Sequence, residues 1–349
     1  MEIFMSSKDY VGKINESEIS VFKLKSGRLE AKILNYGAII QSLKLDGRDI
    51  VFGFDTLDGY IKTNDYYGAI AGRYANRIAD GRFMLGDQKI ILDKNENGIS
   101  HLHGGFKGFD KAVWNTFSSE HYISLTKSFK DGNQGYPGNI DVSITYSLQY
   151  NRMVIIIDAD SDADTVFNPT SHSYFNLSGA NGENDILAHK LTLYADKYNE
   201  IDENKIPVGE AIPVEDTPFD FRKAIKIGER INEDNIQLEY GNGYDHNYWI
   251  NKDNKNSIKI QNKTCYRAAT VEYGNITMDV FSSQPCIQFY SGNFMNKPYP
   301  FNGGITQRPR YGFCLEPQVC PNSPNLPGCG DALLKKNEKY RYVEVIEFR

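Results

Sequence analysis

Apolar and polar side chains alternate along much of this chain. Residues 190–193, 276–280 and 343–345 each place an apolar side chain at every second position. Alternation with a period of two puts one face of an extended segment on a core and the other toward solvent, as in antiparallel sheets. Residues 153–157 are instead an uninterrupted, mostly β-branched apolar run, which predicts a strand buried on both faces.

Turn signals separate these runs. Gly and Asn reach positive φ easily and Pro presets φ, so hairpins and loops are predicted at Asp46-Gly47, Asp80-Gly81, Gly86-Asp87, Asp131-Gly132, Pro137-Gly138 and Asn302-Gly303. Helical candidates are minor, and the clearest is the segment 222–231, with apolar Ile225, Ile227 and Ile231. Because a parallel sheet needs helical crossovers between its strands, the pattern predicts an all-β fold, a large antiparallel β-sandwich forming one domain over residues 1–349.

The charge and hydropathy of the chain limit the kinds of partner that we expect it to bind. The 349 residues include 45 Asp and Glu against 39 Lys and Arg, a net charge of −6. Nucleic-acid binding rests on clustered positive charge, so nucleic acid is not an expected partner. No stretch approaches the 18 apolar residues of a membrane span, and the N-terminus lacks a signal-peptide core. We therefore expect a soluble, cytoplasmic protein that makes no membrane contact.

The cysteines and the aromatic residues add two further expectations. All five cysteines fall in the last third of the chain, at Cys265, Cys286, Cys314, Cys320 and Cys329. Their odd number and the lack of a Cys-x-x-Cys spacing predict free, mostly buried thiols rather than disulfides or a zinc site. The 23 Tyr and 19 Phe are the one compositional excess, and tyrosine suits sheet surfaces and sugar-binding clefts alike.

The segment 101–105 carries two histidines followed by two glycines. In an extended segment His101 and His103 would lie on the same side, which is one arrangement for a metal pair, although the further ligands that such a site needs cannot be placed. The two glycines instead favour a tight turn or a close approach of the backbone to a ligand. A structural turn histidine is the third interpretation.

Two other segments concentrate polar or acidic groups. Residues 168–179 crowd Asn, Thr and Ser around His172, and these side chains can hydrogen-bond a polyhydroxylated ligand or one another. His172 is thus a ligand contact or a satisfied core histidine. Glu316 follows an apolar run and precedes a proline. Burial there would raise the pKa of Glu316 toward general-base usefulness; a surface glutamate at a strand end is the alternative.

Asp245 and two arginines complete the candidates. Asp245 follows the glycine-rich loop 241–243 and stands just before aromatic residues, so it is either a ligand contact or a turn residue at a strand entrance. Arg73 and Arg77 flank Asn76, and an arginine fork beside an amide is a natural grip on paired hydroxyls. Surface ion pairs are the more frequent role of such arginines. None of these signals is specific alone.

Together and in this order, the segments closely resemble the aldose 1-epimerases, the galactose mutarotases. The matching segments are residues 35–38, 72–78, 101–105, 108–111, 135–139, 172–177, 245–247, 284–285, 288–290 and 315–318. They spread over nearly the whole chain, so the resemblance does not rest on a single module.

The resemblance implies a β-supersandwich with its active site in an open cleft on one sheet. It also implies cofactor-independent interconversion of the α and β anomers of aldohexoses such as galactose and glucose, with no metal. By position within the matching motifs, Glu316 would be the general base and His172 the general acid. The sugar would be oriented by Asn76, Arg77, His103, Asp245 and Gln284, with Gln288 as a rival to Gln284 and with Asn168 or Tyr174 in supporting roles.

Two positions depart from the family pattern, because Pro317 and Cys286 stand where Thr and Gly are expected. Neither change removes a functional group. Three other functions stay open: a hexose-6-phosphate 1-epimerase, which would need additional cationic grip; a glycoside hydrolase using Asp245 and Glu316 as its carboxylate pair; and a non-catalytic sugar-binding protein, which would need no acid–base pair. The preferred aldose and the choice between monomer and homodimer also stay open.

Overall fold

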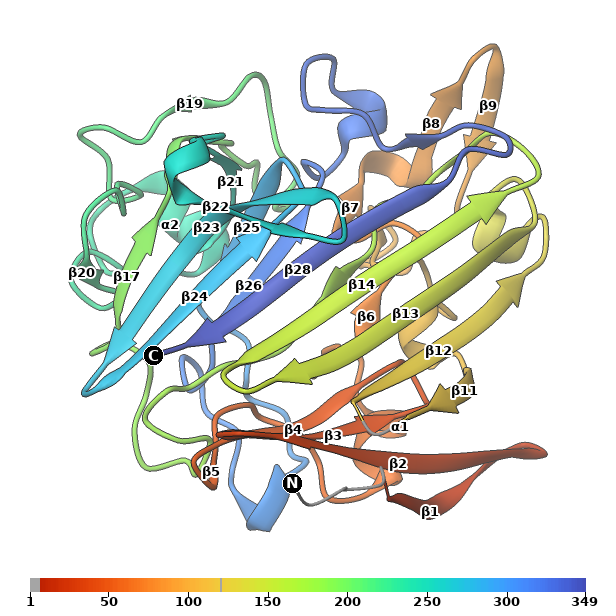
Figure 1. Ribbon diagram of the computed structural model, residues 1–349. Helices are drawn as coiled ribbons and strands as arrows, with labels where there is room; N and C mark the ends of the chain where they lie inside the picture. The colour runs from red at the N-terminus through yellow and green to blue at the C-terminus, as the bar shows by residue number, and fades with distance from the viewer. Residues whose placement is uncertain (1–6, 120) are drawn as a thin grey trace.

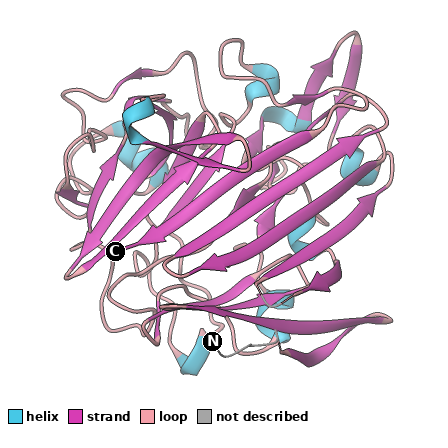
Figure 2. Ribbon diagram, viewed as in Figure 1, coloured by secondary structure: helices cyan, strands magenta, loops and turns pink. Residues whose placement is uncertain are grey.

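Three antiparallel sheets dominate the computed structural model, which describes residues 7–119 and 121–349 (Figures 1 and 2). The largest has ten strands and crosses the front of Figure 1 diagonally. Its spatial order is β11 (Asn115–Ser118), β12 (Tyr122–Phe129), β13 (Ile140–Gln149), β14 (Arg152–Ser161), β28 (Tyr340–Phe348), β24 (Ile276–Ser282), β23 (Lys263–Tyr273), β17 (Lys190–Leu193) and β20 (Ile225–Lys226), with β22 (Ser257–Ile260) paired to β23.

Two five-stranded sheets accompany it. The N-terminal sheet runs in chain order through β1 (Lys8–Ile14), β2 (Ser17–Ser26), β3 (Leu29–Leu34), β4 (Ile40–Leu45) and β5 (Arg48–Asp49). The site sheet, our name for the third sheet, has the order β19 (Ile212–Pro213), β18 (Ala195–Tyr198), β21 (Asp245–Ile250), β25 (Cys286–Tyr290) and β26 (Cys314–Gln318). One apolar core cluster draws residues from all three sheets, for example Ile33, Ile155 and Phe289.

Four two-stranded ribbons and two short helices complete the structure. The ribbons are β6 (Ile70–Ala71) with β16 (Thr170–Ser171), β7 (Arg77–Ile78) with β10 (His101–Leu102), β8 (Arg82–Leu85) with β9 (Gln88–Ile91), and β15 (Thr165–Val166) with β27 (Leu333–Leu334). The only α-helices among the described residues are α1 (Leu57–Lys62) and α2 (Ile236–Gly241). In the same part of the chain no helix is long and apolar enough to cross a membrane, and all five cysteines are free and buried, as predicted.

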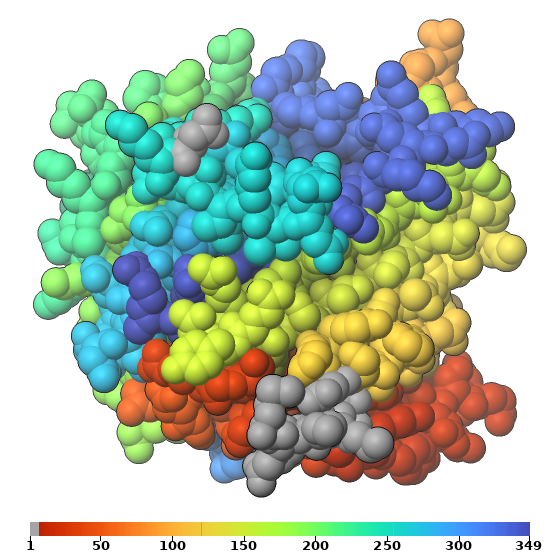
Figure 3. All heavy atoms as spheres, in the orientation of Figure 1, coloured from red at the N-terminus to blue at the C-terminus, as the bar shows by residue number. Residues whose placement is uncertain are grey.

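The run 153–157 is confirmed as a strand buried on both faces. It lies within β14, and each of its five side chains is buried. Met153 and Ile155 join the main core, whereas Val154 and Ile156 join a second cluster that contacts Ile258 and Ile260 of β22. The hairpin of β22 and β23 therefore covers part of the outer face of the large sheet, as Figures 1 and 3 show.

The expectation that the polar members of the alternating strands face solvent is wrong at two positions. Asp279 of β24 and Glu344 of β28 are 1% and 2% exposed. Asp279 accepts a hydrogen bond from Thr270 at 2.5 Å and pairs with Arg349 at 2.7 Å. Glu344 accepts one from the Tyr342 hydroxyl, and burial raises the pKa of Glu344 to about 8. Glu344 shares its strand face with Tyr342 and Ile346 of the main core, and Asp279 lies on the other face of its strand, beside Arg267 and Arg349.

The helix predicted over residues 222–231 is also wrong. Only Ile225–Lys226 is regular there, as the edge strand β20 that pairs with β17. Ile227 and Ile231 are buried, but the backbone of Ile227 bonds to His189 and not along a helix. Ile225 and Ile227 are two residues apart, which is a strand spacing, and Gly228 disfavours a helix.

Candidate active site

Six of the seven predicted site residues line one cavity of about 670 Å³. They are Asn76, Arg77, His103, His172, Asp245 and Glu316, and none of them is more than 9% exposed. The site sheet supplies the floor, because side chains at every second strand position share a face. The ladder places Asp245 opposite Tyr290, Tyr290 opposite Cys314, and Gln288 opposite Glu316. The opposite face of these strands, including Tyr248 and Phe289, packs into the core.

Glu316 and His172 meet in this cavity. The Nε2 atom of His172 lies 3.6 Å from Oε1 of Glu316. The other carboxylate oxygen, Oε2, is buried and has no hydrogen-bond partner among the described residues. Burial, reinforced by the charge of Asp245, raises the pKa of Glu316 well above its ordinary value. The expectation of a buried carboxyl group with a raised pKa is therefore confirmed.

His172 is held from both sides. Its backbone N–H donates to the carbonyl of Ala69 at 2.9 Å, beside the ribbon of β6 and β16. The ring stacks on Tyr174 with centroids 5.1 Å apart, and Nδ1 lies 3.6 Å from the sulfur of Cys314. Burial lowers the pKa of His172 to about 4. Burial therefore disfavours the charged forms of both groups, the carboxylate of Glu316 and the imidazolium of His172.

The neutral ring of His103 has a defined tautomer, with one nitrogen left to face the cavity. Its Nδ1 accepts a hydrogen bond from the backbone N–H of Asn76 at 3.1 Å, so the proton of the neutral ring sits on Nε2. His103 has φ of +50°, and Gly104 follows with φ of +90°. A Cβ on Gly104 would lie 1.8 Å from the Gly72 carbonyl oxygen, so close backbone packing explains the glycine there.

His101 does not form a pair with His103. Its Nδ1 contacts the carbonyl oxygen of Asp93 at 2.7 Å, and its Nε2 contacts the Tyr136 hydroxyl at 2.7 Å. The ring is fully buried, and burial lowers the pKa of His101 to about 4. His101 is therefore a satisfied structural histidine, which leaves no metal pair in this segment.

A metal ion is also a poor fit to the cavity. The ligand atoms of His103, His172 and Glu316 lie within 4.8 Å of one another. A histidine that binds a metal donates its other ring N–H to an acceptor. In His103 that other nitrogen accepts from a backbone N–H instead, so the nitrogen left for a metal is the one that carries the proton. The donor set suits hydrogen bonds to a polar organic ligand better.

Arg77 is fixed by a carboxylate that the motifs did not indicate. Its Nε and Nη2 donate to the two oxygens of Glu96 at 2.8 and 2.7 Å, and its Nη1 lies 3.5 Å from Oδ1 of Asn76. Burial alone would lower the pKa of Arg77, but Glu96, Asp245 and Glu316 together raise it. The surface-pair interpretation is wrong, because the guanidinium is buried and faces the cavity in a two-point ion pair.

Asp245 stands at the start of β21, and Gln288 of β25 holds it. The Gln288 amide donates to Oδ1 of Asp245 at 2.7 Å. Burial raises the pKa of Asp245, and Arg77 partly offsets this. Gln284 does not reach the cavity: it precedes β25, and its amide donates to the Tyr340 hydroxyl at 2.7 Å. Of the two rival glutamines, the structure brings Gln288 to this group of residues.

Asn168 and Tyr174 support neighbouring segments. The Asn168 side chain bonds both the N–H and the carbonyl of Val319, just beyond β26, at 2.7 and 3.2 Å. The Tyr174 hydroxyl donates to the carbonyl of Asp65 at 3.0 Å, and the Tyr174 ring lines the cavity.

Sequence reasoning missed several residues that line the cavity, including Tyr66, Glu96, Lys205 and Phe294. The Tyr66 ring packs against both His103 and His172, with centroid distances of 4.4 and 5.8 Å. Lys205 lies over the ring of Phe294 at 5.3 Å. Tyr66 precedes the matching segment 72–78 by six residues, and Glu96 precedes 101–105 by five. Glu96 lies outside every matching segment, so no motif indicated it.

Comparison with known proteins agrees with the resemblance seen in the sequence motifs. The sequence profile of the family described as aldose 1-epimerase matches residues 20–347. Galactose mutarotase from Mus musculus is 37% identical over 335 residues, which cover 95% of this chain and 94% of the relative. Aldose 1-epimerase from Haemophilus influenzae is 36% identical over 307 residues, 86% of each chain.

Solved structures agree with the fold. The crystal structure of a galactose 1-epimerase from Lactobacillus acidophilus NCFM matches with a TM-score of 0.86 and 28% identity, covering 99% of this chain and 98% of that one. An aldose epimerase homologue from C. elegans has a TM-score of 0.84 at 23% identity. The predicted all-β sandwich is confirmed by these matches.

Proposed function

The chain belongs to the aldose 1-epimerase family and is an epimerase, and we propose that it interconverts the α and β anomers of free aldohexoses, D-galactose and D-glucose among them. The observation that carries the proposal is the buried pair of Glu316 and His172, 3.6 Å apart. The second carboxylate oxygen of Glu316 has no hydrogen-bond partner among the residues described. We place the activity in cytoplasmic hexose metabolism, with the free sugar as the substrate.

Anomer interconversion needs an acid and a base on the two oxygens of the anomeric carbon. Glu316 takes the proton of the anomeric hydroxyl while His172 protonates the ring oxygen, so the C1–ring oxygen bond breaks and the open aldehyde forms. Rotation by about 180° about C1–C2 turns the other carbonyl face toward the ring hydroxyl. Reclosure uses the same two groups with their roles reversed, as microscopic reversibility requires.

The single proton of the pair suits this cycle. In the free site burial disfavours the charged forms of both groups, so the proton rests on the Glu316 carboxyl group while His172 is neutral. A sugar hydroxyl that donates to Oε2 of Glu316 stabilises the carboxylate and leaves the proton to His172. The acid and the base are then both in the correct state without exchange with water.

The surrounding groups orient the sugar. The Nε2–H of His103 donates a hydrogen bond, Asp245 accepts from hydroxyl groups, and Arg77 donates the N–H groups that Glu96 leaves free. Gln288 is a positioning residue that holds the Asp245 carboxylate. Discrimination between galactose and glucose depends on how well these partners satisfy one ring hydroxyl of changed configuration.

Polarimetry tests the proposal. Freshly dissolved α-D-galactose and α-D-glucose relax to the equilibrium rotation slowly, and we expect the protein to accelerate both. Glucose 6-phosphate and an aryl galactoside serve as comparison substrates. Acceleration confined to the phosphate ester would replace the proposal with a sugar-phosphate epimerase, and release of the aryl group would replace it with a hydrolase. No effect on any of the four substrates by folded protein would contradict it.

A further inference from the structure

Strand β26 presents two groups to the same imidazole. Cys314 and Glu316 are two residues apart, so their side chains share one face of the strand. The Cys314 sulfur lies 3.6 Å from Nδ1 of His172, and the Glu316 carboxylate lies 3.6 Å from Nε2. We propose that Cys314 is a positioning residue, whose thiol proton holds neutral His172 in the tautomer that carries its hydrogen on Nε2. The inference rests on the proposed function only for its kinetic consequence.

The thiol is built into the site and is not a chance neighbour. Cys314 is fully buried and packs in a cluster with Tyr67, Tyr174, Tyr290 and Met295. Within the described part of the chain, its sulfur is the only side-chain hydrogen-bond partner of His172 Nδ1, and the residue's own backbone carbonyl adds a smaller interaction with the ring. A neutral imidazole has one donor and one acceptor nitrogen, and the partner of one nitrogen sets the state of the other.

The chemistry of a buried thiol gives the direction of this hydrogen bond. Burial, with the nearby charges of Glu316 and Asp245, raises the pKa of Cys314 well above its ordinary value, so the sulfur keeps its proton. The S–H group then donates to Nδ1, and the imidazole proton stands on Nε2, toward Glu316. When His172 takes a second proton, the thiol can rotate and accept weakly from Nδ1–H, because sulfur is both a weak donor and a weak acceptor.

A thiol also leaves the imidazole weakly basic. A carboxylate at this position would stabilise the imidazolium and raise the pKa of His172. The other titratable or charged groups around His172 are Glu316, His103, Tyr66, Tyr174 and, further off, Arg77 and Asp245. None of the described ones reaches Nδ1. Protonated His172 is therefore a strong acid toward the ring oxygen, which is a weak base.

The tautomer can be measured without any activity assay. Long-range ¹H–¹⁵N NMR on the ¹⁵N-labelled protein separates the two neutral tautomers of a histidine by their nitrogen shifts, and His172→Asn identifies the signal. We expect the Nε2–H form for His172 in the wild type. We expect Cys314→Ser to keep this form and Cys314→Ala to shift the population toward Nδ1–H. An Nδ1–H form in the wild type overturns the inference whether or not a variant folds.

Kinetics supply the second readout. Cys314→Ala should lower kcat about 10-fold, the worth of one hydrogen bond, with KM changed less than about twofold, and Cys314→Ser should restore most of the rate. Cys265→Ser, another buried thiol far from the cavity in the cluster under β22, controls for the general effect of a buried hydroxyl. If Cys314→Ala changed neither kcat nor the tautomer of His172, the role of the thiol would be packing alone. A wild type with the Nε2–H form but no mutarotation would contradict the proposed function and leave the Cys314 assignment standing.

Discussion

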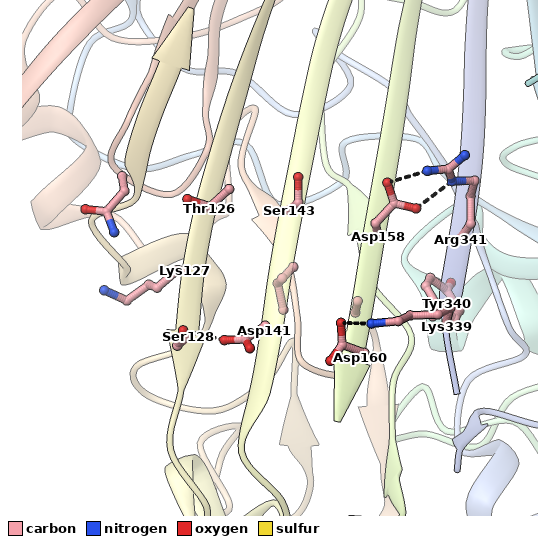
Figure 4. A pocket seen from close by; sticks show the side chains of 13 residues that line it. Thr126, Lys127, Ser128, Asp141, Ser143, Asp158, Asp160, Lys339, Tyr340 and Arg341 are labelled. Atoms are coloured by element: carbon pink, nitrogen blue, oxygen red, sulfur yellow. Dashed lines mark hydrogen bonds and ion pairs between the residues drawn. The ribbon is translucent and has the colours of Figure 1, made fainter. Parts of the chain in front are cut away.

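Two hollows of similar size differ in nearly everything that matters for chemistry. The cavity on the site sheet has about 670 Å³, and a second hollow on the outer face of the ten-stranded sheet has about 580 Å³. Both are lined by charged and hydroxyl side chains. Figure 4 shows the outer hollow, where strands β12, β13, β14 and β28 present their side chains side by side.

The charges of the outer hollow are already paired and exposed to water. Arg341 donates to both oxygens of Asp158 at 2.6 and 2.9 Å, and Lys339 pairs with Asp160 at 2.7 Å. These four side chains are between 37% and 79% exposed. Exposed pairs of this kind contribute only about 0–1 kcal/mol, because water and salt screen them.

In the site cavity the same kinds of group are buried and incompletely paired. Oε2 of Glu316 has no hydrogen-bond partner within the part of the chain that the structure describes, and burial moves the pKa values of Glu316 and His172 in opposite directions. The volumes of the two hollows are alike, so volume does not mark the functional one. The site cavity differs from the outer hollow because its polar groups are desolvated and can still form hydrogen bonds with a ligand.

The largest effect is expected from removing the acid or the base. Glu316→Gln and His172→Asn should each lower kcat by about 10²-fold or more, since one positioned acid or base contributes about 10²–10⁴-fold. Glu316→Gln keeps the size of the side chain, and His172→Asn keeps a smaller polar side chain in its place, so circular dichroism should be unchanged. Near-wild-type turnover in either folded variant would remove that residue from the mechanism.

A smaller loss is expected when the support of Arg77 is weakened. Glu96→Gln removes the charge that fixes the guanidinium at two points, and we expect kcat/KM to fall roughly 10-fold, mainly through KM. Initial rates over a range of galactose concentrations measure this. A fall in kcat alone would place Glu96 in the chemical step instead of in sugar binding.

The pH dependence of kcat/KM tests whether the groups of the site cavity are desolvated, unlike those of the outer hollow. Burial lowers the pKa of His172 to about 4, and a second proton on the pair removes the base. The acid limb of kcat/KM in the free enzyme should therefore fall near pH 4, far below the ordinary histidine value of about 6.5. Fluorescence at each pH checks that the protein stays folded. An acid limb centred near pH 6.5 would mean that the pair is solvated.

The smallest effect is expected in the outer hollow. Asp158→Asn breaks the two-point pair with Arg341, yet kcat and KM should stay within about twofold of the wild type and the free energy of unfolding within about 1 kcal/mol. A loss of turnover comparable with that of Glu316→Gln would erase the distinction between the two hollows.

The sequence was informative where the chemistry lies in short, ordered motifs. Glu316, His172 and the Asn76–Arg77 pair could be named because the ordered segments that contain them resemble a known family, whereas the local signal at each residue was not specific alone. The two glutamines could not be separated, because Gln284 and Gln288 lie in one short stretch. Only the ladder, which sets Gln288 opposite both Asn247 and Glu316, identifies the one that reaches the site.

Other features depend on contacts between distant parts of the chain. Glu96 fixes Arg77, 19 residues away, and Tyr66 packs against two histidines that are distant from it in the sequence. Asp279 and Glu344 are expected to face solvent until the fold shows that Glu344 lies on the core face of β28 and that two arginines contact Asp279. The alternating pattern predicts strands reliably. It does not tell which strands have both of their faces covered by other parts of the chain. The extent of the single domain stays a prediction.

The most direct test of the central claim is the exchange rate between anomers at equilibrium. ¹³C exchange NMR on D-galactose labelled at C1 measures this rate without a net reaction, with wild type, Glu316→Gln and Asp158→Asn compared at equal concentration. The account predicts rapid exchange with the wild type and with Asp158→Asn, and exchange reduced by about 10²-fold or more with Glu316→Gln. Equal exchange in all three samples would contradict it.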